Sequence, residues 1–572
     1  MDYKISYQDP NSQYIDIDVK ISTLGEERTR IHLPAWRPGR YELGNFAKNI
    51  QKFNAYNSNG ELLKSMKITK DCWEIEGGDS KFVTIKYNYY ANQLNAGSTY
   101  LDEEQLYVNP VNCLVYKENN IDEVCSLRIE VPKNYKIGIA LKNEGNNQFR
   151  ANSYHELVDS PFIASPSIHH HSFKVASTEF HLWFQGVFKP EWKQIESDFK
   201  AYTKEQIKLF EEFPVSDYHY LFQILPYSAY HGVEHSASTV IALGPSYSIL
   251  NRNERYLDFL GVSSHELFHT WNVKRLRPAD MWPYDYSREN YSRMGYLTEG
   301  ATTWYGDLML YRSAVFSDED FFKTFSQLLN RHFNNPGVLN LSVADSSFDT
   351  WLDGYEAGVP NRKSSIYVEG AMVTFLLDHE IRKSTQNNFS FDDLLRGLYK
   401  EAFMKDKGVT EEMYRKLAEQ LASKKLSSFF NNYIYGASDI MRALKQALKY
   451  LGLELLIENS ENFEETYLGI RIKGQQLMSI YPNSIASESG FKVGDQIMTI
   501  NGIEVKDNFS KWLEFFKDDQ ISILINRQVS GQKRLELIID SNRKFYRKYG
   551  LRKVEKPTSA QMENFKLWKK TV

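Results

Sequence analysis

Residues 260–271 read LGVSSHELFHTW, and the pentapeptide HELFH occupies residues 265–269. Residues four apart share one face of an α-helix, so a helix here would turn the imidazoles of His265 and His269 toward the same point. Two histidines at this spacing can hold a metal ion, and Glu266 between them can reach a water molecule beside it. The alternative is a pair of ordinary histidines on an amphipathic helix. The motif thus predicts metal ligands at His265 and His269 and a general base at Glu266.

A third ligand is needed if the site is catalytic and keeps one coordination position open. Glu299 is the candidate, since it lies in YLTEGATTWY (residues 296–305), a stretch that should form a second helix. A carboxylate buried among apolar and aromatic side chains needs a partner, and a zinc ion is such a partner. An acid that caps its helix is the alternative interpretation. The sequence therefore predicts one Zn²⁺ per chain, held by His265, His269 and Glu299.

The composition narrows the class of protein. The chain has 572 residues, which at roughly 150 residues per domain suggests about three or four domains. Lys and Arg number 69 against 73 Asp and Glu, so no overall positive field favours nucleic acid, and no nucleic-acid partner is expected. No apolar stretch is long enough to span a membrane and no export signal is visible, so we expect a cytoplasmic protein. Three cysteines exclude a disulfide-based scaffold.

The hydrophobic pattern changes twice along the chain. Residues 1–165 contain short alternating runs such as YIDIDVKI (residues 14–21), which are typical of half-buried strands in a sandwich of antiparallel sheets. Residues 166–455 have mainly helical spacing, with a few strands near the start, and short strands interrupted by Gly return in residues 456–545. Residues 546–572 are basic and predict either a solvated tail or a packed terminal segment. We therefore expect a multi-domain α+β protein.

Three motifs resemble a known family. HELFHTWNVKRLRP (residues 265–278) and LTEGA (residues 297–301) resemble the glycyl aminopeptidase family, a branch of the gluzincin, or thermolysin-like, zinc metallopeptidases that carries a PDZ domain. PAWRPGRY (residues 34–41) is similar to that family's N-terminal signature, and the resemblance covers nearly the whole chain. It implies an N-terminal antiparallel β domain, a mainly helical thermolysin-like catalytic domain and a C-terminal PDZ domain.

The resemblance implies the same metal site as the motif. His265, His269 and Glu299 match the zinc ligands of gluzincins, and Glu266 matches the general base. The implied activity is that of a zinc aminopeptidase, which hydrolyses N-terminal residues from peptides with a free N-terminus. Small residues, Gly or Ala, are the implied preference.

A short segment before the metal motif resembles a substrate-binding strand. GVEH (residues 232–235) is similar to the G-x-x-E-N strand of aminopeptidases, in which the Glu binds the free α-amine of the substrate. Gly232, Val233 and Glu234 are therefore expected to bind substrate, and His235 takes the place of the Asn. The alternative for Glu234 is an exposed acid at a strand edge.

Tyr367 is the expected donor to the oxyanion. IYVEGA (residues 366–371) resembles the gluzincin motif Y-x-K-G-A, with Glu369 in place of the Lys. The chemistry gives an independent reason, because a tetrahedral intermediate needs a donor aimed at its negative oxygen and a Tyr O–H can supply it. A packed aromatic is the alternative. Thr303 and Asp307 follow Glu299 where some related enzymes place an acid that orients a histidine, and their roles stay open.

The C-terminal part resembles a PDZ domain. YLGI (residues 467–470) and GFKVGDQIMTING (residues 490–502) carry this resemblance. In PDZ domains the backbone N–H groups of the first motif receive a peptide's C-terminal carboxylate, which implies a binding loop of Leu468, Gly469 and Ile470. A structural module that packs on the catalytic domain is the alternative.

Two other functions remain open on the sequence. One is a PDZ-guided zinc endopeptidase, in which Glu234 does not exclude longer chains. The other is a non-catalytic PDZ protein that binds peptides, against which the complete set of His265, Glu266, His269 and Glu299 argues. The expected partners are peptide substrates with a free N-terminus and a peptide ligand of the PDZ domain.

Overall fold

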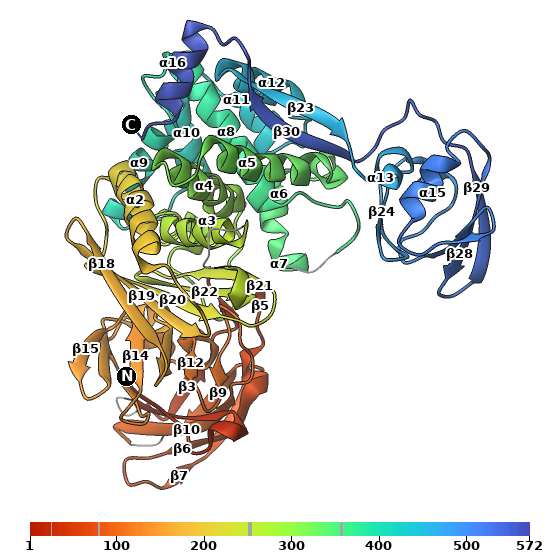
Figure 1. Ribbon diagram of the computed structural model, residues 1–572. Helices are drawn as coiled ribbons and strands as arrows, with labels where there is room; N and C mark the ends of the chain where they lie inside the picture. The colour runs from red at the N-terminus through yellow and green to blue at the C-terminus, as the bar shows by residue number, and fades with distance from the viewer. Residues whose placement is uncertain (24–25, 78–79, 250–253, 355–357, 572) are drawn as a thin grey trace.

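The computed structural model describes residues 1–23, 26–77, 80–249, 254–354 and 358–571. The chain is a mixed α+β protein with a β-rich N-terminal domain and a mainly helical domain above it (Figure 1). A small β-rich body stands to one side and is joined to the helical domain by strands β23 and β30 (Figure 1).

The N-terminal domain is built on an eight-stranded sheet. Alternate residues of its strand Tyr14–Ser22 are buried, because successive side chains of a strand point to opposite faces. The predicted antiparallel domain contains one exception, since the first strand pairs in parallel with Cys125–Ile129. In spatial order the strands are β15 (Lys142–Gly145), β16 (Gln148–Ala151), β13 (Cys125–Ile129), β1 (Asp2–Ser6), β2 (Tyr14–Ser22), β10 (Phe82–Tyr90), β6 (Ile50–Tyr56) and β7 (Leu62–Leu63).

Three smaller sheets complete this domain in the described part of the chain, and one of them reaches a later segment of the chain. They comprise β11 (Tyr100–Leu101), β12 (Leu106–Val108), β17 (Phe162–Ser165) and β14 (Lys136–Ile139); β3 (Arg28–His32), β9 (Cys72–Glu76) and β8 (Ser65–Thr69); and β4 (Trp36–Arg37) with β5 (Arg40–Leu43). The indole N–H of Trp36 donates to the carbonyl of Asp285, and Trp36 packs edge-on against Tyr284. The β4–β5 ribbon is therefore anchored to the segment around Tyr284 and Asp285.

The helical domain opens with a five-stranded sheet, which is larger than the few strands that the sequence predicts. Its order is β18 (His169–Val175), β19 (Thr178–Gly186), β20 (Asp217–Ile224), β22 (Ser238–Gly244) and β21 (Ala229–Glu234). One face of the sheet shares a hydrophobic core with α2 (Trp192–Phe210) and α3 (Glu254–Phe268). Strand β21 lies at the edge of this sheet, so among the described strands it pairs on one side only, with β22.

The helices expected from the sequence form the rest of this domain. Two glycines bring two of them unusually close, because a methyl group at Gly300 would overlap the Cα atom of Gly370. This contact holds the π-helix Tyr296–Ala301 against the start of the helix Ile366–Thr385. The principal helices are α4 (Thr302–Arg312), α5 (Asp318–Phe333), α6 (Val343–Phe348), α7 (Thr350–Asp353), α8 (Ile366–Thr385), α9 (Phe391–Glu401), α10 (Glu411–Leu421), α11 (Ser427–Phe429) and α12 (Met441–Tyr450).

The basic C-terminal segment is packed and does not form a solvated tail. Strand β30 (Arg547–Lys553) pairs along its whole length with β23 (Leu453–Asn459), so residues 456–459 belong to a stem shared with the helical domain. After β30, the helix α16 (Ser559–Trp568) lies on that domain, and Trp568 is buried in its core. Val572 is outside the described residues.

The small body has a hydrophobic core of its own. Its six strands are β24 (Ile470–Lys473), β25 (Gln476–Ile480), β26 (Gln496–Ile500), β27 (Ile503–Glu504), β28 (Ile521–Arg527) and β29 (Gly531–Leu537). Three short helices accompany them, namely α13 (Phe463–Tyr467), α14 (Ile485–Glu488) and α15 (Phe509–Phe515).

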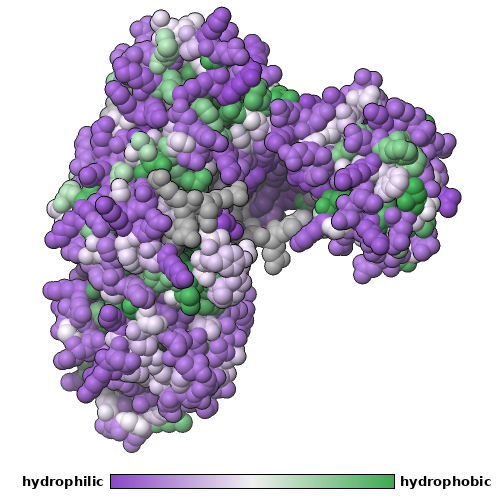
Figure 2. Space-filling model, viewed as in Figure 1, coloured by the Kyte–Doolittle hydropathy of each residue, from purple (hydrophilic) through white to green (hydrophobic). Residues whose placement is uncertain are grey.

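Within the described residues, no helix has both the length and the apolar character that crossing a bilayer requires. The visible face of the molecule is mostly hydrophilic, with apolar residues in small scattered areas (Figure 2). The three cysteines are buried and unpaired.

Candidate active site

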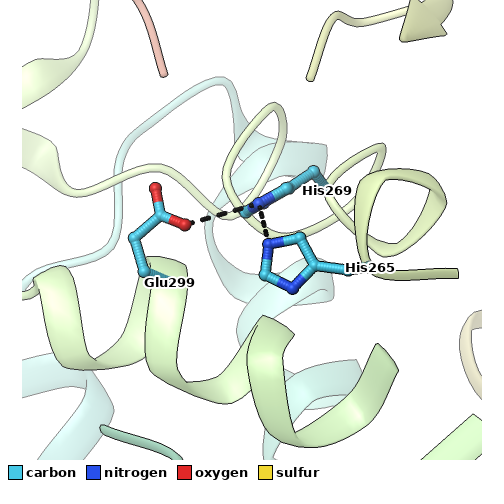
Figure 3. Close-up of side chains that lie close together, drawn as sticks. All are labelled: His265, His269 and Glu299. Carbon is cyan, nitrogen blue, oxygen red and sulfur yellow. Dashed lines mark hydrogen bonds and ion pairs between the residues drawn. The ribbon is translucent and has the colours of Figure 1, made fainter. Parts of the chain in front are cut away.

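The two motif histidines converge with Glu299, as the sequence predicts (Figure 3). His265 lies in the last turn of α3 and His269 follows directly after it. Their Nε2 atoms are 3.0 Å apart, and Nε2 of His269 is 3.5 Å from Oε2 of Glu299. One nitrogen of each ring and one oxygen of Glu299 lie within 4.8 Å of one another. These three atoms from two elements therefore surround one point.

This donor set fits a zinc ion. Two imidazole nitrogens and one carboxylate oxygen are the protein ligands of a zinc site that keeps an open position. Glu299 and His269 are buried, at about 2% exposure each, so a cation there would compensate a carboxylate removed from water. Burial, and the neighbouring His269, lower the pKa of His265 well below its ordinary value, which favours the neutral ring that binds metals.

Backbone contacts fix the orientation of His269. Its Nδ1 lies 2.6 Å from the carbonyl oxygen of Asn272, so the Nδ1–H donates there and Nε2 faces the metal point. The Asn272 amide in turn donates to the carbonyl of Leu297 and to the hydroxyl of Thr302. The turn after α3 is thereby tied to the π-helix that carries Glu299. The sequence did not reveal Asn272 or Thr302 in this role; Thr303 and Asp307, the residues left open, line the cavity instead.

Glu299 is held by a residue of the other domain. The hydroxyl of Tyr41, on β5, donates to Oε1 of Glu299 over 3.2 Å, and Tyr41 is buried at 6% exposure. The family-like motif of residues 34–41 contains this tyrosine, yet nothing in the sequence indicates that it reaches a residue so far along the chain. The N-terminal domain therefore supplies a hydrogen bond to one of the predicted metal ligands.

We expect Tyr41→Phe to weaken zinc binding about 10- to 100-fold, the usual effect of removing a group that orients a metal ligand. The reason is that Glu299 loses the donor that fixes its carboxylate. Competition with a chelator measures the change, with the exposed Tyr247→Phe as a control. Equal zinc affinity in both variants would contradict a positioning role for Tyr41.

Glu266 lies against the backbone of the edge strand. A methyl group at Gly232 would overlap Oε1 of Glu266, so only glycine leaves room for this carboxylate. Its other oxygen, Oε2, is buried and has no hydrogen-bond partner within the described residues. Burial first, and then the negative charges of Glu234 and Glu299, raise the pKa of Glu266 above its ordinary value. The carboxylate is thus placed beside the metal point with one oxygen unoccupied.

Glu234 is buried rather than exposed at the strand edge. Its exposure is 4%, and its Oε1 has no hydrogen-bond partner among the residues described. Oxygens of Glu234 and Glu266 and a ring nitrogen of His269 lie within 4.8 Å of one another. Gly39, between β4 and β5, has a positive φ of 84°, and a side chain there would overlap Oε2 of Glu234. The N-terminal domain therefore covers this carboxylate.

The residues on either side of Glu234 point elsewhere. Val233 is buried in a core on the opposite face of the sheet, as the alternation of a strand requires. His235, which takes the place of the expected Asn, turns away and its Nδ1 lies 3.0 Å from Oδ1 of Asp159. Gly232 and Glu234 are therefore the two residues of this motif that face the metal point.

A single cavity of about 710 Å³ brings most of the predicted residues together. Tyr367, in the first turn of α8, lines it, so its position is compatible with a donor role. Glu369, the residue in place of the expected Lys, is buried and its carboxylate lies 2.6 Å from Nδ1 of His332. The predicted residues that line the cavity are Gly232, Glu234, His265, Glu266, His269, Glu299 and Tyr367.

The predicted carboxylate loop lies in the small body, away from this cavity. The N–H groups of Leu468 and Gly469 donate to the carbonyl of Glu464, over 3.1 and 2.9 Å. The ring of Phe545 packs against Gly469, and Ile470 is buried. The loop is closed in this structure, because two of its backbone donors already have internal partners.

Comparisons with known proteins indicate the class of this chain. Residues 2–166 match the Peptidase M61 N-terminal domain, and residues 258–373 match the M61 glycyl aminopeptidase domain. A solved structure of an aminopeptidase N family protein from Idiomarina loihiensis is 25% identical, covers 99% of both chains and has a TM-score of 0.90. An M1 zinc metallopeptidase from Deinococcus radiodurans, solved also as a variant bound to a Tyr-Ser-Ala substrate, is 13% identical over 77% of this chain and 94% of its own, with a TM-score of 0.49. None of the curated proteins matches the chain.

The fold and the family models define the protein as a peptidase. More narrowly, the two matched segments confirm the resemblance to the M61 glycyl aminopeptidase family that the sequence predicts, and neither match includes the predicted PDZ domain.

Proposed function

We propose that this peptidase is a zinc-dependent aminopeptidase that removes single N-terminal residues from peptides. The observation that carries the proposal is the buried carboxylate of Glu234, which has an oxygen without a partner and lies within 4.8 Å of Glu266 and His269. A buried, uncompensated charge is costly, and a cationic α-amine is the natural group to neutralise it beside a scissile bond. If Glu234 binds the α-amine, only the first residue of the peptide lies between the amine and the scissile bond.

Each residue of the site then has one task. Zinc bound by His265, His269 and Glu299 supplies Lewis acidity, which polarises a carbonyl and lowers the pKa of water. Glu266 accepts the proton of the attacking water at its free oxygen and passes it to the leaving amine nitrogen. The hydroxyl of Tyr367 donates a hydrogen bond to the negative charge that develops on the carbonyl oxygen.

A preference for Gly or Ala as the first residue belongs to the same proposal. The side chain of the first residue is attached to the Cα atom that carries the amine. The proposed binding partner of that amine is the carboxylate of Glu234, which the turn at Gly39 closely covers. A large side chain would have little room under this turn.

We expect Glu234→Gln to lower kcat/KM for free-amine peptides about 10- to 150-fold, because a charge-assisted hydrogen bond contributes about 1.5–3 kcal/mol. The substitution keeps the size of the side chain but removes its charge. Rates on matched free and N-acetylated peptides, with zinc content as a control, measure the effect. An equal loss of kcat/KM for both peptides would show that Glu234 does not bind the α-amine.

Tyr367→Phe removes only the hydroxyl and tests the oxyanion role. We expect kcat to fall about 10²- to 10³-fold, the range found when one such donor is removed, with little change in KM. Steady-state kinetics on an aminoacyl reporter gives both constants. A rise in KM alone would assign Tyr367 to substrate binding.

The other two functions receive less support. An endopeptidase would need Glu234 to be open to a continuing chain, whereas Gly39 covers it. A PDZ role for residues 456–545 rests on the sequence resemblance, and the occupied donors of Leu468 and Gly469 argue against capture of a peptide carboxylate there. We therefore propose a PDZ-type module whose role is structural. A cytoplasmic location stays a prediction.

A further inference from the structure

The active-site cavity continues beyond the catalytic residues and is lined there by one face of α5. Lys323, Gln327 and Arg331 line it at intervals of four residues, the spacing that puts side chains on one side of a helix. This end of the cavity therefore carries two cations, whereas Glu234 and Glu266 place acids at the catalytic end.

Arg331 has no hydrogen bond or ion pair with any described residue. Two acids line the same cavity and have neighbours of their own: Asp258 lies 3.2 Å from Arg255, and Asp307 lies beside the hydroxyl of Thr324. Burial also raises the pKa of Asp307 to about 7, so this carboxyl carries only part of a negative charge at neutral pH. A guanidinium that faces a binding cavity without a protein partner is suited to bind an anionic group of the ligand.

Arg331 lies at the far end of the substrate strand from Glu234. Arg331 and Tyr230, which is near the start of β21, line the same cavity, and the positive charge of Arg331 acts to lower the pKa of Tyr230. Four residues separate Tyr230 from Glu234, a span of about 13 Å at about 3.3 Å per residue. An extended peptide with its amine at Glu234 would reach Arg331 with about its third or fourth residue.

Contacts of Asn330, the residue next to Arg331, help to fix the position of Arg331. The amide of Asn330 donates to the carbonyl of Tyr549 over 2.6 Å and accepts from its N–H over 2.9 Å, which locks α5 to β30. At the other end, Ser317 and Asp320 form a capping box that starts the helix. The helix is thereby held in one rotation, which turns Arg331 toward the cavity.

We propose that Arg331, assisted by Lys323, binds a carboxylate of the substrate on the far side of the scissile bond, and that the enzyme therefore prefers short peptides with an acidic end. This inference rests on the proposed aminopeptidase function. The carboxylate comes either from the C-terminus of a peptide of about three or four residues or from an Asp or Glu side chain at that distance. A planar guanidinium can hold either one with two parallel hydrogen bonds.

Three tripeptides that begin with Gly separate these sources. The first, Gly-Ala-Ala, has a free C-terminus; the second is its C-terminal amide; the third is the amide of Gly-Ala-Glu. We expect native kcat/KM to be higher for the first or the third than for the second, by about 10- to 150-fold. Arg331→Gln should abolish that preference by raising KM for the carboxylate-bearing peptides, and Arg331→Lys should keep part of it. Arg534→Gln, on an exposed strand of the small body, is the charge-matched control and should change nothing.

The outcomes test the carboxylate site separately from the proposed aminopeptidase function. If the native enzyme cleaves all three peptides equally well and Arg331→Gln changes none of the rates, the carboxylate site is wrong while the aminopeptidase function stands. If the native enzyme releases Gly from none of them, the proposed function itself fails. Lys323→Gln serves as a second variant if Arg331→Gln does not fold, and its expected effect is a smaller rise of KM for the same peptides.

Discussion

The variant Glu266→Gln is expected to lower kcat by about 10²- to 10⁴-fold, the contribution of a positioned general base, and to keep its zinc. Gln has nearly the shape of Glu and fits the same space against Gly232, but it cannot accept a proton from water. Glu266 is outside the set of His265, His269 and Glu299 (Figure 3), although it also converges with Glu234 and His269. Steady-state rates and metal content, measured on the same preparation, give the two quantities.

A matched control for this variant is Glu488→Gln, at an exposed ion pair with Arg543 on the small body. Its turnover should equal that of the native protein. Turnover near the native value in Glu266→Gln would reassign the base, and loss of zinc would instead make Glu266 part of the metal shell.

The variants His265→Ala and Glu299→Ala are expected to lose both zinc and measurable activity. Each removes one of only three protein ligands, and the remaining two cannot define a zinc site with an open position. The native protein should contain about one zinc per chain, held by His265, His269 and Glu299. Elemental analysis after dialysis against a weak chelator measures the stoichiometry.

His170→Ala is the control for these ligand variants. His170 lies on the sheet surface, stacks on Trp183 and is hydrogen bonded to His181, so its loss removes an imidazole without touching the site. It should keep full zinc occupancy. Full occupancy in His265→Ala or Glu299→Ala would mean that the zinc is bound elsewhere.

The sequence predicts those parts of the structure that depend on local spacing. HELFH (residues 265–269) places two imidazoles on one helix face wherever that helix forms, and the alternation in residues 14–21 fixes which side chains of a strand are buried. The third ligand, Glu299, could be predicted because an acid in an aromatic, apolar stretch needs a partner. The role of Glu234 came only from the family resemblance, whereas for Tyr367 the need of the intermediate for a hydrogen-bond donor added a chemical reason.

Contacts between distant segments could not be predicted. Tyr41 reaches Glu299 across a domain boundary, and Gly39 covers Glu234 from the same ribbon, although neither pair has any spacing that links it in the sequence. The role proposed for Arg331 could not be predicted either, because Arg331 is exposed and an exposed Arg on an amphipathic helix is ordinarily a solvated residue.

At the loop around Gly469 the sequence motif predicts a binding role, but the structure provides no open site there. There the family-like motif is present, but a neighbouring carbonyl, that of Glu464, takes the donors on which the predicted role depends. A motif specifies residue types, whereas the availability of backbone N–H groups depends on how the preceding segment packs.

The proposed role of Glu234 as the amine anchor is tested most directly by the products formed from one peptide in two forms. A hexapeptide that begins with Gly, with a free N-terminus and with an N-acetyl cap, is incubated with the native enzyme, and the products are followed by mass spectrometry. We predict stepwise loss of single residues from the free peptide and no significant cleavage of the capped one. Internal cleavage of both peptides at similar rates would contradict the aminopeptidase account and establish an endopeptidase.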